Sequence, residues 1–113
     1  NLDFLEEALD SDDCVNSLSD GGAHCGTICD AAATTFMLQH WVRDREGHRI
    51  PLERAIKRQC HDTARLYSFE DRGVLAPGLL ADLNVIDLES LQLNLPTVAF
   101  DLPAESLLPP HNR

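Results

Sequence analysis

The feature that most constrains the fold of this chain is a change of hydrophobic spacing at Gly73. Before Gly73 the apolar residues recur at the three- and four-residue intervals of amphipathic helices. After it, strand-forming Val and Ile stand between turn residues, and apolar residues alternate from Leu91 onward. The sequence therefore predicts a helical part followed by a hairpin-like β part over residues 73–102, with a loose tail over 103–113.

Three segments before Gly73 have the spacing of helices. A short amphipathic helix is expected over Leu2–Leu9, followed by an acidic loop. A broad apolar face predicts a second helix at about 31–43. Pro51 opens the third, at about 51–67, because proline is tolerated in the first turn of a helix.

The Pro77-Gly78 pair predicts a type II turn within the β part. Proline fixes φ at the second position of such a turn, and glycine accepts the positive φ of the third position. Asp82 is expected to accept hydrogen bonds from backbone donors and so to tie the turn back to the strand that follows it.

A short apolar run, Cys14–Leu18, ends in the sequence Ser19-Asp20-Gly21-Gly22-Ala23-His24. A run of about five residues that ends in a glycine pair is typical of a strand that breaks into a tight turn, where backbone N–H groups approach a ligand. The pattern predicts a strand at about 14–19 with Asp20 at the mouth of a site. From these residues alone, the alternative that Asp20 only caps the next turn stays open.

Length and charge exclude several classes of protein. At 113 residues the chain is one domain at most, and no apolar run approaches the roughly 18 residues that span a membrane. The net charge of −10 disfavours nucleic acid as a partner. No signal peptide is visible, so a cytoplasmic location is expected. Eight of the nine Lys and Arg residues lie between Arg43 and Arg72, and the interleaved acids favour a solvated helical face over a binding patch.

The four cysteines, Cys14, Cys25, Cys29 and Cys60, are expected to be reduced, buried thiols, because the chain lacks the features of a small secreted scaffold. A zinc-binding module that uses these cysteines and His61 is the alternative. It is less favoured because the spacing is C-x3-C with adjacent partners downstream, unlike the paired C-x2-C of structural zinc sites.

Two sets of motifs resemble a known family. Residues 73–87, GVLAPGLLADLNVID, resemble the signature G-x-[IL]-x-P-G-x-x-A-D-[LI]-x-[VL]-x-D near the C-terminus of amidohydrolase-superfamily enzymes. The Ser19–His24 sequence, with Asp62–Arg65 and Asp71–Gly73 following it, resembles the D-aminoacylase branch, the N-acyl-D-amino-acid deacylases. The resemblance covers about residues 14–102.

For the fold, the resemblance implies an α/β chain that is the C-terminal part of a metal-dependent (β/α)8 barrel plus part of a small β-sandwich. Residues 1–72 would supply the last barrel strand and the helices after it, and residues 73–102 would belong to the sandwich. The remaining barrel strands, with the histidine ligands of such enzymes, would lie N-terminal to Asn1. This missing N-terminal barrel portion is the expected polypeptide partner.

For function, the resemblance implies a metal-dependent amide hydrolase that acts on C–N bonds other than peptide bonds, with a small N-acyl amino acid or a related amide as its substrate. The implied cofactor is a divalent metal, usually zinc, with most ligands outside this chain. Asp20 matches the acid that contacts the metal and moves the proton. His24, Gly21 and Gly22 would contact the substrate, although His24 is equally well read as an ordinary loop histidine.

On this interpretation the isolated chain is expected to be inactive. The alternative from another class is a non-catalytic truncated fragment or interaction module that lacks the metal ligands.

Overall fold

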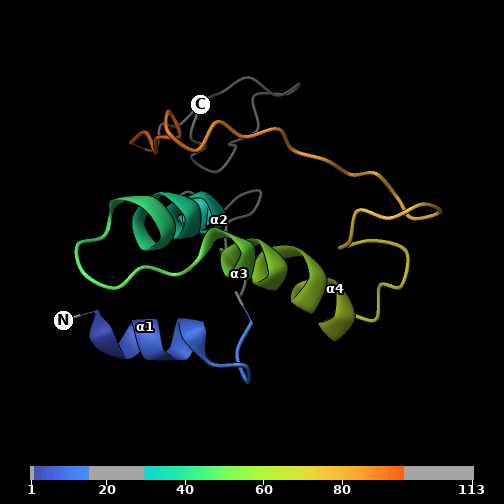
Figure 1. Cartoon of the computed structure of the whole chain (residues 1–113), viewed down its shortest axis with the longest axis horizontal. Coiled ribbons are helices and arrows are strands. Elements are labelled where there is room, and N and C mark those ends of the chain that lie inside the picture. Colours follow the sequence, from blue (N-terminus) through green and yellow to red (C-terminus); the bar gives the residue numbers. More distant parts are fainter. Residues whose placement is uncertain (1, 16–29, 96–113) are drawn as a thin grey trace, which may run out of the picture.

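The computed structural model describes residues 2–15 and 30–95, and these contain short helices joined by irregular segments (Figure 1). Helix α1, Asp3–Asp10, is followed by the first long helix. That helix begins as the 3-10 turn η1, Asp30–Ala32, continues as α2, Ala33–Phe36, and ends as the wider π-helical η2, Met37–Asp44. The second long helix runs through α3, Leu52–Lys57, the π-helical η3, Arg58–Asp62, and α4, Thr63–Leu66. We call these two long helices the helix pair.

The helices lie in the three segments where the hydrophobic spacing predicted them. Helix α1 carries Asp3 and Glu6 in its first turn, where carboxylates interact favourably with the positive end of the helix dipole. Pro51 stands at the N-cap of α3, and its carbonyl accepts the Ala55 N–H at 3.0 Å. The second long helix ends at Leu66, and Ser68, in the turn after it, has a φ of +60°.

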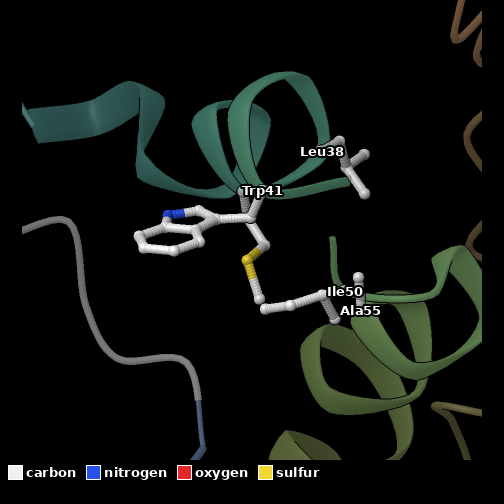
Figure 2. Packing of buried hydrophobic residues seen from close by; sticks show 5 residues of the cluster. Leu38, Trp41, Ile50 and Ala55 are labelled. Atoms are coloured by element: carbon white, nitrogen blue, oxygen red, sulfur yellow. The ribbon is translucent and has the colours of Figure 1, made fainter. Parts of the chain in front are cut away.

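The core of the described part lies between the two long helices. Met37, Leu38 and Trp41 face inward from η2, while Ile50 and Ala55 come from the connection and from α3 (Figure 2). The Ile50 N–H donates to the Trp41 carbonyl at 3.0 Å, which turns the connection back toward η2 and buries Ile50 almost completely. Hydrophobic burial at this junction is therefore what holds the pair together.

The segment after α4 lies along the helix pair without regular structure. It contacts the second long helix at Gly73, and a turn at residues 88–90 packs beside η2. The Arg43 guanidinium donates to the Leu88 and Leu91 carbonyls, each at 2.6 Å, and the Leu93 N–H donates to the Gln39 side chain at 2.8 Å. In Figure 1, α1 and this C-terminal segment lie on opposite sides of the helix pair.

The predicted α/β class is wrong for the part of the chain that the structure describes. Residues 73–95, expected to contribute to a β-sandwich, contain no strand, and neither do Cys14 and Val15, the described start of the expected barrel strand. The remaining residues of those two segments, 16–19 and 96–102, lie outside the described ranges. A strand needs a second strand to take its N–H and C=O groups, and the helices beside residues 73–95 provide none.

A turn also interrupts the predicted β pattern. The Asp87 carboxylate accepts the Glu89 N–H at 3.1 Å and the Ser90 N–H at 3.4 Å, and this turns the chain between the two expected strands. Bonding from Ser90 and Glu89 also lowers the pKa of Asp87 below its ordinary value.

No helix within residues 2–15 and 30–95 is long and apolar enough to cross a membrane.

Candidate functional site

A cavity of about 530 Å³ lies between the second long helix and the segment that follows it. Its volume is within the range of pockets that accept small molecules. Most of its lining is aliphatic or aromatic. Leu38 and Ile56 come from the helix pair, while Phe69, Leu80, Leu83 and Ile86 come from the segment after α4. The cavity lining therefore includes much of the segment whose sequence resembles the superfamily signature.

Gly73 fixes how closely that segment approaches the helix. Its φ is +87°, a conformation that residues with a side chain rarely adopt. A Cβ at this position would lie 2.8 Å from the Ala64 Cβ and 2.9 Å from the Cys60 carbonyl oxygen. Only glycine therefore allows the backbone to lie this close to η3 and α4. Apart from the glycine itself, no sequence pattern indicates this contact.

The type II turn at Pro77-Gly78 is confirmed. Gly78 has a φ of +87°, and the Leu79 N–H donates to the Ala76 carbonyl at 3.2 Å. The Leu80 N–H then donates to the Asp71 carbonyl at 2.8 Å, which closes the segment into a loop at the edge of the cavity.

An arginine and two carboxylates form the charged edge of the cavity. Arg72 donates to both carboxylate oxygens of Asp71, at 2.9 and 3.3 Å, and lies 3.6 Å from an Asp82 oxygen. The hydrogen bond from Arg72 lowers the pKa of Asp71, and the same bond raises the pKa of Arg72. Asp82 was expected to bond backbone donors; its contact is instead this long ion pair, at an exposed side chain.

The other polar groups of the lining serve the backbone. The Thr63 hydroxyl donates to the Arg58 carbonyl at 2.7 Å, and the Gln59 amide donates to the Thr34 carbonyl at 2.9 Å. Cys60 is an exposed free thiol, as is Cys14, so the expectation of reduced cysteines holds for these two while that of burial does not. The cavity can enclose an apolar group, and three of its polar side chains, Gln59, Thr63 and Arg72, are committed to structural contacts.

The residues to which the sequence analysis assigned catalysis and substrate binding, Asp20, Gly21, Gly22 and His24, lie outside the described part of the chain. So do Cys25 and Cys29 of the alternative zinc module. Their roles stay predictions.

No metal-binding group exists among the described residues, since no three His, Cys, Asp or Glu side chains in residues 2–15 and 30–95 come together. Within these ranges two histidines contact a carboxylate: His48 contacts Glu6, which also pairs with Arg45, and the Nδ1 of His61 lies 2.9 Å from Asp62. Asp62 is already bonded by the Lys57 ammonium at 2.6 and 2.8 Å, and a cation held there opposes a second one. These residues do not fit a metal.

The basic residues between Arg43 and Arg72 were expected to form a solvated face, and for several of them this is wrong. Arg58 is 3% exposed, and Arg45 lies over the Trp41 ring, 4.6 Å from its centroid. The hydrogen-bond partners of these two arginines, Asp3 for Arg45 and Cys14 for Arg58, are more than forty residues away in the sequence. The local charge pattern therefore could not reveal them.

Comparison with known proteins assigns the chain to a family of hydrolases. The sequence model described as the amidohydrolase family matches residues 1–107, which is most of the chain. The chain belongs to the amidohydrolase family. Members of this family are commonly metal-dependent. The comparisons with curated proteins and with solved structures found no match.

Proposed function

We propose that this chain is part of a hydrolase that cleaves the amide bond of N-acyl amino acids, of the N-acyl-D-amino-acid deacylase type, and that Asp20 is its proton-transferring acid. The observation that carries the proposal is the family match over residues 1–107, because the matched range contains both the Asp20 motif and the signature at residues 73–87. The glycine contact and the type II turn within that signature are consistent with a segment whose glycines are required by geometry.

In the proposed reaction, the Asp20 carboxylate accepts a proton from the attacking water as the water oxygen bonds to the amide carbonyl carbon. The carbonyl carbon becomes tetrahedral, and its C–N bond then breaks. Asp20 returns the proton to the departing nitrogen, so that a carboxylic acid and a free amine leave the site. Asp20 thus acts first as general base and then as general acid, and it ends the cycle ionised.

His24, with the backbone N–H groups of Gly21 and Gly22, is proposed to contact the substrate. A divalent metal, with zinc as the first candidate, belongs to the proposal through the family. Residues 2–15 and 30–95 hold no group of three His, Cys, Asp or Glu side chains that could ligate it.

The test is the substitution Asp20→Asn in the protein that carries this chain, with N-acetyl-D-leucine and its L enantiomer as substrates. An amide cannot accept the proton, so kcat should fall by about 10²- to 10⁴-fold. Asp13→Asn is the matched control, because it makes the same chemical change at an exposed position and should leave kcat unchanged.

Wild-type turnover in Asp20→Asn, at an unchanged melting temperature, would contradict the assignment of Asp20. If the wild-type protein itself hydrolyses neither enantiomer, the non-catalytic interaction module becomes the better interpretation. Hydrolysis of the L substrate alone would keep the reaction class and reject the D-aminoacylase type.

A further inference from the structure

Helix α1 and the residues after it, here called the acidic segment (residues 3–14), attach to the helix pair with little apolar burial. None of the α1 residues is buried, and Phe4 is 77% exposed. Leu9 is the α1 residue that packs, partly buried, against the core. Hydrophobic burial therefore gives this helix much less stability than it gives the helix pair.

Ion pairs attach the N-terminal end of the acidic segment. Arg45 lies between the two carboxylates of Asp3 and Glu6, with its Nη2 3.1 Å from an Asp3 oxygen. Glu6 also contacts the His48 ring through its other oxygen. Glu6 is therefore the acid that joins α1 to two basic side chains of the loop after η2.

Two arginines of the second long helix make the contact at the other end. Arg54 lies 2.5 Å from an Asp10 oxygen and 3.2 Å from Asp12, while Arg58 lies 3.1 Å from the same Asp12 oxygen. Arg58 also donates to the Asp10 carbonyl at 3.3 Å and to the Cys14 carbonyl. The segment covers Arg58 and leaves it 3% exposed.

We propose that the acidic segment is a strap held on the helix pair by charge, and that it opens as a unit while the two long helices stay folded. The basic face beneath it, Arg45, His48, Arg54 and Arg58, is then uncovered. The pairs made by the exposed Asp3 and Asp12 contribute little stability, and the desolvation of the largely buried Arg45–Glu6 pair offsets much of its attraction. These pairs therefore hold the strap less firmly than packing holds the core. Opening exposes a cluster of cations in a protein whose net charge is −10.

Hydrogen exchange on the full chain tests this. Glu6→Gln removes the carboxylate that pairs with Arg45 and contacts His48. Exchange of the α1 amides should speed up by at least about tenfold, because the side chains of Arg45 and Glu6 are only 12% and 18% exposed and Arg45 loses its partner. Amides of α3 and α4 should exchange at an unchanged rate. The fluorescence of Trp41, the single tryptophan, should change as well, because Arg45 lies over its ring.

Glu7→Gln is the matched control: it makes the same change on the same helix at an exposed side chain, and should alter α1 exchange by less than about twofold. Asp12→Asn, which removes the acid shared by Arg54 and Arg58, should accelerate α1 exchange as Glu6→Gln does. Equal effects of Glu6→Gln and Glu7→Gln would overturn the proposal. So would equal acceleration in α1 and in α3–α4, because the segment would then open only when the helix pair unfolds.

Discussion

Replacing Gly73 with alanine tests how the segment after α4 is attached to the helices. Two costs add at this position. An L residue in the left-handed region loses about 1–2 kcal/mol relative to its preferred conformation. The new Cβ also lies within 3 Å of the Ala64 Cβ and the Cys60 carbonyl oxygen, and neither is the end of a flexible side chain. Such overpacking costs about 1–3 kcal/mol.

The free energy of unfolding should therefore fall by about 2–5 kcal/mol in Gly73→Ala, a large part of the ~5–15 kcal/mol that a domain typically has. Gly78→Ala is a matched control. Gly78 has the same φ of +87°, yet a Cβ there meets nothing within 4 Å. The free energy of unfolding of Gly78→Ala should therefore fall only by the conformational contribution, about 1–2 kcal/mol.

Urea denaturation of the two variants and the wild type, followed by circular dichroism, measures the difference directly. The steric contribution is the amount by which Gly73→Ala exceeds Gly78→Ala. If the two variants are equally stable to within about 0.5 kcal/mol, the steric contribution at Gly73 is absent, and the segment after α4 does not lie in close contact with the helix.

Two further predictions concern charged residues. Asp82→Ala should change the free energy of unfolding by less than about 0.5 kcal/mol, because its exposed carboxylate lies 3.6 Å from Arg72; a larger loss in urea denaturation would favour the backbone role expected from the sequence. Hydrogen bonds from Lys57 first and His61 second lower the pKa of Asp62 below 3.8. A carboxylate whose pKa is lowered in the folded state stabilises that state above its unfolded-state pKa, and this stabilisation is lost as pH falls through the folded-state pKa. Lys57→Met removes the main cause of the lowered pKa, so the decline of the melting temperature below about pH 4 should become flatter. An acid limb identical to wild type would refute this coupling.

The sequence predicted the helices well and the β part poorly, for one physical reason. A helix satisfies its backbone groups within its own segment, so the spacing of apolar residues around Trp41 or Ala55 is enough to locate it. The β-branched Val85 and Ile86 and the alternation at Leu91, Leu93 and Leu95 describe only a tendency toward extended backbone. Whether such a run becomes a strand depends on a second strand, which the run itself does not encode.

The charged contacts escaped prediction for a related reason. Arg43, Arg45 and Arg58 are unremarkable basic residues in the sequence, and their partners are fixed only once the helix pair has formed. The cavity was missed because its lining combines residues from Leu38 to Ile86. The Asp20 motif, in contrast, is a local pattern, and its assignment stays a prediction that the activity measurements above will test.

The tethering by arginines also bears on the order in which the chain folds. Arg54 and Arg58 reach back 44 residues to Asp10 and Cys14, while Arg43 reaches forward 45 residues to Leu88. The acidic segment and the segment after α4, the two flanks of the helix pair, thus close loops of nearly equal length. The entropy lost in closing a loop varies only slowly with its length. We therefore expect neither flank to have a kinetic advantage over the other. Because the helix pair holds the buried core, we expect it to form first, and the flanks to dock on it in either order along two parallel routes.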